Sequence, residues 1–453
     1  MATGNLTVEE LTSLVASREI DTVIIGFTDM QGRLVGKRAS ARLFLEELAE
    51  HGAECCNYLL AVDVENNTVD GYAISSWDRG YGDMAMMPDL ATLRHTPWLP
   101  GTVMVTADLT YLDGTPVNPD PRQILKRQLA RLEKLGLTSL AATELEFIVF
   151  DDTYRDAWKK GYTDLTPASD YNIDYALMAS TRMEPLLRDI RNHMDAAGMY
   201  CEGVKGECNL EQQEIAFRYT DALGTCDNHS LYKNGAKEIA DQHGKSLTFM
   251  AKFNEREGNS CHIHLSVRGT DGSTVMADKD RPYGFSKLME HWIAGQLATL
   301  REFTLFFAPN INSYKRYVDG SFAPTAVAWG VDNRTCALRV VGSGHSLRAE
   351  NRVPGGDVNP YLAMAAIIAG GLYGIEHELE LEPIFEGNAY TSDAPRVPAS
   401  LREATELFAA SEIAIEAFGE DVVEHYLNNA RIEQTAYDAA ITDWERVRGF
   451  ERF

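Results

Sequence analysis

The sequence predicts a mixed fold of strands and helices in two parts. With 453 residues, the chain exceeds what one hydrophobic core usually serves, so two domains, or one large domain with an appendage, are expected. Strand-like and helical segments occur up to about residue 112, and the proline-rich passage Thr115-Pro-Val-Asn-Pro-Asp-Pro121 follows. We therefore expect a small N-terminal domain at residues 1–112 and a larger domain at residues 113–453.

The N-terminal part reads as a small unit of strands and one helix. Strands are expected at residues 21–27 and 34–37, around a turn in which Gly32 can adopt a positive φ. A helix near residues 41–51 follows, and a further strand is expected at residues 101–108.

The second part is expected to begin with a helix, because Asp120-Pro121 is a favourable start and Gly136 a favourable stop. A buried strand, Ala141–Phe150, comes next. Residues 151–180 show weak periodicity and predict an ordered surface insertion. Further helices are expected at residues 182–197, with Pro185 in the first turn, 286–307, 360–379 and across 400–448.

Composition excludes several classes of protein. The net charge of −25 and a pI near 4.8 argue against partners such as nucleic acid or anionic membranes, and they favour a cytoplasmic protein. Seven cysteines without a C-x-x-C pattern indicate neither a disulfide framework nor a zinc site. The N-terminus lacks a basic region followed by an apolar one, so no secretion signal is expected. The longest apolar stretch, residues 361–373, is too short to span a bilayer.

The buried strand carries two carboxylates. Side chains alternate along a strand, so Glu144 and Glu146 project from the same face. Two adjacent buried anions require a counter-charge. Two glutamates spaced in this way are, by themselves, more typical of a solvated strand face. Whether they form a functional site depends on whether other segments supply cations or hydrogen-bond donors.

Two further segments offer metal-ligating side chains. Glu207 and Glu214 are seven residues apart, so a bend must bring them together. Taken alone, this segment is typical of an acidic turn. His262, His264 and Ser266 alternate on one face of an expected strand, although an isolated pair of histidines is more often structural.

The segment Arg348-Ala-Glu350-Asn-Arg352 is more specific. As a strand, it places two guanidinium groups and a carboxylate on one face. This pattern suits either a self-paired surface ladder or a site where arginines hold carboxylate or phosphate oxygens while the glutamate takes a metal. Residues 312–316 and 332–339 add more cationic groups. Together these segments suit the binding of a metal-bound polyphosphate.

The motifs, taken in order, resemble those of the bacterial type I glutamine synthetase family across nearly the whole chain. They are Glu144-x-Glu146, Glu207 with Glu214, Gly258 to His262-x-His264, Asn312-Ser-Tyr-Lys-Arg316, Asn333-Arg334-Thr, Arg348-x-Glu350-x-Arg352 and Asn359-Pro-Tyr361. The resemblance implies an α+β fold with a β-grasp-like N-terminal domain and a glutamine-synthetase catalytic domain, whose antiparallel strands form a funnel. It also implies a homo-oligomer, a dodecamer of two hexameric rings with each active site between adjacent subunits.

The resemblance also implies roles for individual residues. Two or three Mg²⁺ or Mn²⁺ ions per site are implied, a choice that suits carboxylate and imidazole ligands. The ligands of the ion near glutamate are Glu146, Glu207 and Glu214, and those of the ion beside the ATP phosphates are Glu144, His262 and Glu350. The residues implied for glutamate are Glu146, Gly258, Arg316 and Arg352. Those implied for ATP are Phe217, Tyr219, His264, Ser266, Arg334, Arg339 and Arg348.

The implied reaction consumes ATP, because a carboxylate is a poor acylating agent. The γ-carboxylate of glutamate attacks the γ-phosphate, giving γ-glutamyl phosphate, and an amine then displaces phosphate. Arg334 is the expected catalytic residue that stabilises the transferred phosphoryl group, and Arg316 is a second catalytic candidate.

Two departures from the family pattern bear on the acceptor. Phe322 stands where the family has a flap glutamate that helps to bind ammonium, and Asn57–Val64 replaces the D-G-S-S segment that lends an aspartate. Loss of two anions weakens the binding of ammonium, while an aromatic ring suits an alkylamine. We therefore expect a γ-glutamyl-amine ligase that uses ethanolamine or a polyamine. Ordinary glutamine synthetase and a non-catalytic regulatory or structural member of the fold are the alternatives.

Three other positions differ from the family pattern. Glu211 stands where the family usually has glycine, which leaves the shape of its loop open, and Glu257 stands where it often has asparagine. Tyr390 lies near the position of the family's adenylylated tyrosine but lacks the acidic surroundings, so no modification is expected.

Overall fold

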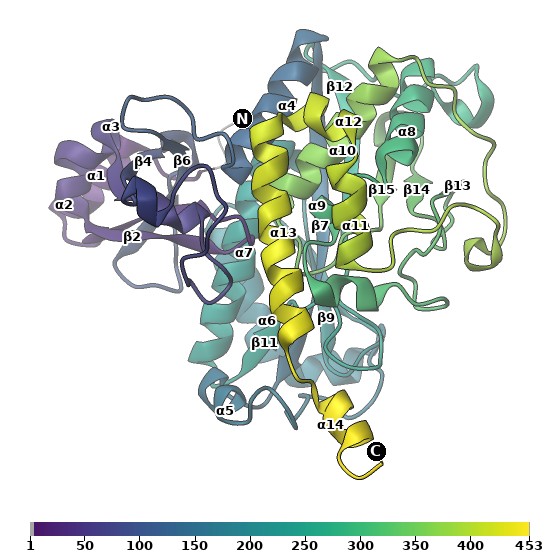
Figure 1. Ribbon diagram of the computed structural model, residues 1–453. Coiled ribbons are helices and arrows are strands. Elements are labelled where there is room, and N and C mark those ends of the chain that lie inside the picture. Colours follow the sequence, from purple (N-terminus) through teal and green to yellow (C-terminus); the bar gives the residue numbers. More distant parts are fainter. Residues whose placement is uncertain (1–3, 453) are drawn as a thin grey trace.

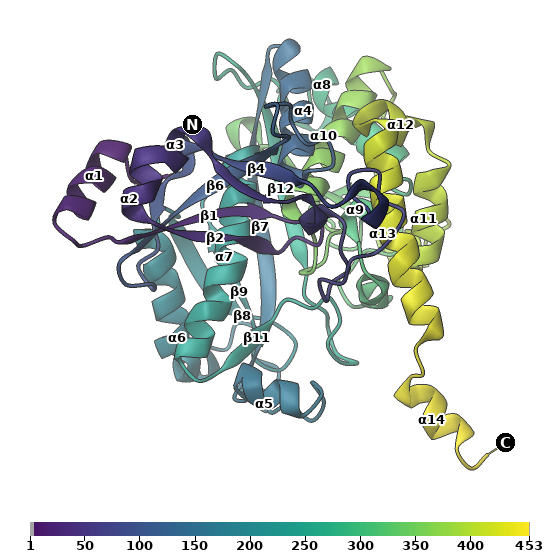
Figure 2. The same cartoon turned by 60° about the vertical axis from the view of Figure 1, so that its left-hand side comes forward.

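The structure, a computed structural model, describes residues 4–452. Figure 1 shows the N-terminal elements on one side of a larger body formed by the rest of the chain. The last helix, α14 (Asp443–Gly449), projects away from this body both there and in Figure 2, which is turned by 60°. Within the described residues, no helix combines the length and the apolar character that crossing a membrane requires.

A six-stranded sheet forms the N-terminal part. Its order is β2-β1-β6-β4-β3, and β5 pairs with β6. The β1–β6 pair is parallel and the other pairs are antiparallel. The strands are β1 (Thr22–Thr28), β2 (Leu34–Ser40), β3 (Ala53–Cys56), β4 (Asp83–Pro88), β5 (Arg94–His95) and β6 (Thr102–Thr110), and helix α1 (Val8–Ala16) precedes them.

The helix expected at residues 41–51 is present, with a widened middle. Ser40 caps it by accepting a hydrogen bond from the Leu43 amide. The helix runs through α2 (Ala41–Leu43), a π-helical turn and α3 (Ala49–His51). Gly52, at φ 73°, ends the helix in a conformation that glycine adopts without strain.

A nine-stranded sheet forms the centre of the larger part. Its order is β13-β14-β15-β12-β7-β9-β8, with β10 and β11 also paired to β7, and only the β13–β14 pair is parallel. The strands are β7 (Leu137–Phe150), β8 (Cys201–Gly206), β9 (Gln212–Phe217), β10 (Thr220–Asp221), β11 (Ser246–Thr248), β12 (Cys261–Gly269), β13 (Trp329–Val331), β14 (Leu338–Val341) and β15 (Arg348–Asn351). The long β7 lies at the centre of the sheet and pairs with β9, β10, β11 and β12.

Helices pack around this sheet. The almost entirely buried α10 contacts α4, α7 and α8, and its N-terminus is capped by Asn359. The helices are α4 (Pro121–Lys134), α5 (Tyr154–Lys159), α6 (Leu177–Ala196), α7 (Ala222–Gln242), α8 (Lys287–Thr299), α9 (Thr304–Phe307), α10 (Pro360–Glu376), α11 (Leu401–Ala409), α12 (Glu412–Phe418) and α13 (Glu420–Ala439). Together with the sheets, they make an α+β fold, which confirms the expected class.

Three expected helices have different bounds. Helix α6 begins earlier than expected, so Pro185 lies inside it and not in its first turn, because buried side chains from Ala179 onward continue the apolar face. The stretch 286–307 is broken into α8 and α9. The stretch 400–448 is broken into four helices, because Ser411 caps a new start and Gly419, at φ 93°, ends α12.

Buried ion pairs join the two parts of the chain. Arg122 of α4 contacts Asp89 at 2.8 Å and Asp108 at 2.6 Å, both from the N-terminal part, and Asp227 of α7 at 3.0 Å. The guanidinium is only 2% exposed, so these carboxylates neutralise a charge that water does not reach. The network fixes the N-terminal sheet against the larger part.

Candidate active site

The register of the central sheet brings the predicted carboxylates together. On β7, Glu144 lies opposite His262 of β12, and Glu146 lies opposite Glu214 of β9. Because Glu144 and Glu146 are two residues apart, they share the face of β7 predicted from strand alternation. The acidic strand therefore lies at the centre of a site supplied by both neighbouring strands.

The first cluster consists of three carboxylates. Oxygen atoms of Glu146, Glu207 and Glu214 lie within 4.8 Å of one another. Burial and the neighbouring Glu207 raise the pKa of Glu146 to about 8. Burial and the surrounding glutamates raise the pKa of Glu214 to about 9. So close a set of buried oxygens fits a hard divalent cation, which would displace the protons that these raised pKa values retain.

The second cluster joins two carboxylates and two imidazoles. Glu144 lies 3.3 Å from Nδ1 of His262 and 3.0 Å from Nε2 of His264. Burial opposes its ionisation, but these imidazoles hold the pKa of Glu144 well below its ordinary value. The fully buried Glu350 receives Arg339 at 2.9 Å and also pairs with Arg352. This cluster is thus ionised and ringed by cations.

The two histidines differ in the hydrogen bonds that their ring nitrogens make. Arg348 Nε donates to Nδ1 of His264 at 3.2 Å, which leaves the His264 proton on Nε2, facing Glu144. His262 directs Nδ1 at both Glu144 and Glu350, 3.6 Å from the latter, while its buried Nε2 has no partner. Ligand atoms of Glu144, His264 and Glu350 lie within 4.8 Å of one another. Both histidines direct an N–H at the ionised Glu144, but only His262 has a second ring nitrogen free to take that proton, which would leave its Nδ1 as a metal ligand.

Both clusters border one cavity of about 480 Å³. Arg334, Arg339 and Arg352 also line it, as does Phe322. Phe322 is 56% exposed and has φ 61°, a strained value for a bulky residue that suggests a functional constraint. A larger cavity of about 660 Å³, between the β1–β2 turn and α7, lies away from both clusters.

The remaining predicted residues lie around this cavity or farther off. Arg316 is buried behind Gly258, with Nη2 donating to the carbonyl oxygens of residues 352–354, while its Nε and Nη1 have no partner. A Cβ at Gly258 would lie 2.2 Å from the Ala251 oxygen, so this position requires glycine. Ser266 lies on β12 beyond His264, with an unpartnered hydroxyl.

The two aromatic residues predicted to contact ATP lie outside the described lining of the cavity. The ring centroid of Phe217 packs 4.9 Å from that of Tyr232. Tyr219 is exposed between β9 and β10. The structure therefore brings together the residues predicted to ligate metal and three arginines, but not these two.

Glu211 keeps the bend that glycine usually provides. Its φ of 44° is a left-handed conformation that favours glycine, and its carboxylate accepts a hydrogen bond from Gln213 at 2.8 Å. The strands on either side still pair, and the Glu207 amide donates to the Gln212 carbonyl oxygen at 2.8 Å. The loop between Glu207 and Glu214 therefore keeps its bend with a glutamate at position 211.

Several residues of the cavity escaped the sequence analysis. Asp174, Tyr175, Lys205 and Gln212 all line it. Gln212 donates to Glu146 at 3.1 Å. Strand alternation could have revealed Lys205, which lies two residues before Glu207, whereas the irregular segment that carries Asp174 and Tyr175 gave no signal.

Comparisons with known proteins agree with this geometry. Residues 118–448 match the model of the glutamine synthetase catalytic domain. The chain is 63% identical over 450 residues to gamma-glutamylethanolamide synthetase GlnA4 of Streptomyces coelicolor, covering 99% of this chain and 97% of that one. It is 36% identical over 439 residues to glutamate–isopropylamine ligase of a Pseudomonas species, covering 96% of each. A solved GmaS/ADP complex superposes with a TM-score of 0.86 at 27% identity, covering 97% of this chain and 99% of that one.

An α+β fold with two carboxylate clusters and arginines around one cavity has the chemistry that suits phosphate and a divalent metal. The chain belongs to the glutamine synthetase family. This confirms the resemblance carried by the sequence motifs. Ligases of the family use ATP and divalent metals, and the two clusters are groups that could bind such metals.

Proposed function

We propose that this protein is an ADP-forming carbon–nitrogen ligase that activates glutamate with ATP and joins it to ethanolamine. The observation that carries the proposal is a single cavity, in which both carboxylate clusters and three arginines lie beside the aromatic side chain of Phe322. An aromatic side chain gives the acceptor end an apolar wall in place of a carboxylate. The relatives named for ethanolamide and isopropylamine products support an amine with an uncharged tail.

The two clusters would each hold a divalent ion. We assign Glu146, Glu207 and Glu214 to one ion, and Glu144, His262 and Glu350 to the other. Mg²⁺ or Mn²⁺ suits these ligands, with two or three ions per site. When bound, such ions neutralise phosphate oxygens and polarise the phosphoryl group.

Residues of this chain would orient the reactants. Arg352 and the backbone at Gly258, backed by Arg316, would hold glutamate with its γ-carboxylate towards ATP. That carboxylate attacks the γ-phosphorus, ADP leaves, and Arg334 and Arg339 stabilise the charge on the transferred phosphoryl group. The amine nitrogen then attacks the acyl carbon, loses a proton and expels phosphate.

The nucleotide would extend along β12 and β15. His264, Ser266 and Arg348 lie on these strands next to the second cluster. Phe217 and Tyr219 stay predicted contacts of ATP, since they lie apart from the cavity lining.

We also propose assembly into a dodecamer of two hexameric rings with sites between subunits. Support comes from the projecting end of the chain, where large apolar side chains face solvent. Their exposures are 71% for Ile441, 65% for Trp444, 71% for Val447 and 88% for Phe450. A second copy of the chain would cover such a surface. A cytoplasmic location and the domain limit at residues 112 and 113 stay predictions.

One assay tests the proposed function. The purified protein is supplied with glutamate, Mg-ATP and one of ammonium, ethanolamine, isopropylamine, putrescine or spermidine, and both phosphate and the amide product are measured. We expect the highest kcat/KM with ethanolamine. Equal or better turnover with ammonium would identify an ordinary glutamine synthetase, and no turnover with any acceptor would indicate a non-catalytic role.

A further inference from the structure

A lysine lies at the first carboxylate cluster. Lys205 of β8 lies opposite Glu214 of β9, which lies opposite Glu146 of β7, so three strands place these residues in one row. The Lys205 ammonium forms an ion pair with Glu207 and lies 3.7 Å from Asp174. It also lies 4.5 Å from the ring centroid of Tyr175. Lys205 therefore ends in a box of two carboxylates and an aromatic face.

This box suits an alkylammonium group, since Lys205 is itself a primary alkylammonium. Charge-assisted hydrogen bonds and a cation–π contact are the interactions that such a group uses. With the side chain only 27% exposed, much of the ammonium's hydration is replaced by these contacts. A free amine that sought the same contacts would have to displace Lys205.

The charges of the cluster lead to the same conclusion. The carboxylates of Glu146, Glu207 and Glu214, together with one divalent ion, leave a single negative charge. The Lys205 ammonium balances it, because an ordinary lysine is fully protonated at neutral pH. The three carboxylates, the ion and Lys205 then sum to zero, and the one negative charge left beside them, that of Asp174, already faces the Lys205 ammonium at 3.7 Å.

We propose that Lys205 is an internal cation, held between Glu207 and Asp174, that restricts the acceptor to amines with an uncharged tail. The inference rests on the proposed function and deepens it. A diamine carries a second ammonium into a cavity where Lys205 repels it and where Asp174 and Glu207 are already paired. A hydroxyl or methyl tail meets no such repulsion.

Glu257 is the carboxylate of the cavity wall that could oppose this effect, since it lies on the same cavity and could receive a second ammonium. A variant therefore has to test Glu257 separately. A preference of the wild-type protein for the diamine would overturn the proposal. Loss of that preference in Glu257→Gln would then show that Glu257 binds the second ammonium.

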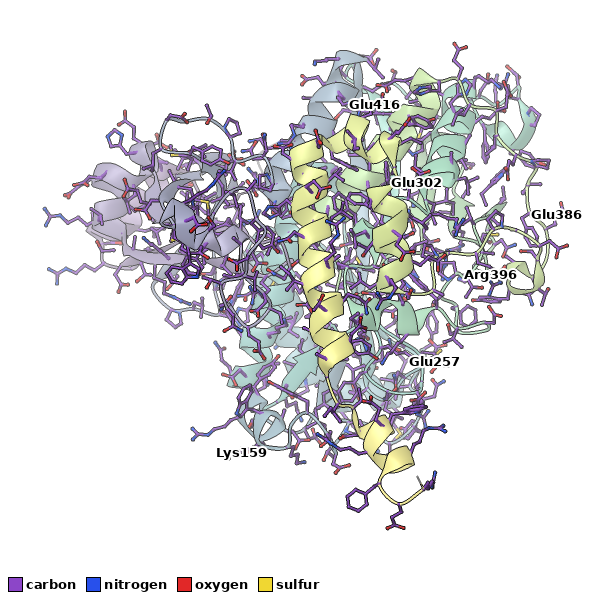
Figure 3. All side chains as sticks on the ribbon, in the orientation of Figure 1. Lys159, Glu257, Glu302, Glu386, Arg396 and Glu416 are labelled. Carbon is purple, nitrogen blue, oxygen red and sulfur yellow. The ribbon has the colours of Figure 1, made fainter. Side chains whose placement is uncertain are left out.

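The test compares two acceptors of equal length, 3-amino-1-propanol and 1,3-diaminopropane, which differ in a hydroxyl against an ammonium. We expect wild-type kcat/KM to favour the amino alcohol, and Lys205→Met to reduce that preference by about tenfold. Lys205→Gln repeats the loss of charge should the methionine variant not fold. Lys205→Arg keeps the charge and should keep the preference. Lys159→Gln is a surface control on α5, which Figure 3 labels well apart from Glu257.

A second readout does not depend on turnover. Titration of the nucleotide-free protein with Mn²⁺ should show tighter binding of the first ion in Lys205→Met, by about fivefold or more, because a neighbouring positive charge is gone. Unchanged amine selectivity in Lys205→Met, an equal change in Lys205→Arg, or an unchanged Mn²⁺ isotherm would each overturn the proposal. Absence of turnover with every amine would instead refute the proposed function, and the Mn²⁺ titration would still test the placement of Lys205.

Discussion

Nη2 of Arg352 lies 3.3 Å from the carbonyl oxygen of Phe322, so an arginine of the site holds the backbone of the flap. The same guanidinium pairs through Nη1 with the buried Glu350 of the second cluster. Arg352 therefore links Phe322, which we propose lies beside the acceptor, with the cluster that we assign to the ATP side. The position of Phe322 depends on this link, while its ring remains exposed to the cavity.

The link allows the ring of Phe322 to be changed without removing the backbone contact. We expect Phe322→Glu to raise kcat/KM for ammonium and to lower it for ethanolamine, by about tenfold in their ratio, because a carboxylate favours a small cation. Phe322→Tyr keeps the ring and should leave the ratio unchanged. Steady-state rates with each acceptor measure this. An unaltered ratio in Phe322→Glu would show that Phe322 does not set selectivity.

Substitution of the two histidines of β12 should affect the affinity for metal differently. Because Nδ1 of His262 faces both carboxylates and its proton can move to the free Nε2, His262→Ala should weaken the binding of one Mn²⁺ equivalent by at least about tenfold. His264→Ala should leave Mn²⁺ affinity within about threefold and raise the KM for ATP. Calorimetric titration with Mn²⁺ measures the first effect and initial rates the second. The reverse result would assign the metal to His264.

The raised pKa values of Glu146 and Glu214 predict how metal-free stability depends on pH. Between the ordinary carboxyl pKa near 4.5 and the folded values of about 8 and 9, the folded protein holds protons that the unfolded chain has lost. Its stability should therefore fall as pH rises from 6 to 9. Thermal unfolding in EDTA measures the slope. Saturating Mg²⁺ should flatten it, because the ion replaces those protons, and Glu214→Gln should make it shallower in EDTA.

The buried network of Arg122 should matter more for stability than a partly exposed ion pair of the same helix. Arg122→Ala leaves three carboxylates without their shared cation and should cost about 3 to 5 kcal/mol. Arg131→Ala removes a pair with Glu376 in which the two side chains are 27% and 34% exposed, and it should cost about 0 to 1 kcal/mol. Unfolding in urea at equal protein concentration compares them. Equal losses would mean that the network does not hold the two parts together.

Local rules predicted much of the fold and part of the site. Proline and glycine marked the limits of α4, and strand alternation placed Glu144 with Glu146. Pro185 misled the placement of α6, because burial of its apolar face outweighed the local signal of a proline. The break between α8 and α9 likewise lacked a glycine or proline to announce it.

The sequence by itself determined the family and the motifs that carry the resemblance, since order, spacing and alternation survive without knowledge of the fold. Only the tertiary structure decided that Lys205 ends between Glu207 and Asp174, and that Arg348 occupies Nδ1 of His264 while Nε2 of His262 has no partner. The physical reason is that strand register and the docking of an irregular segment are fixed by burial of side chains distant in sequence. Contacts of that kind leave no periodic pattern in the chain.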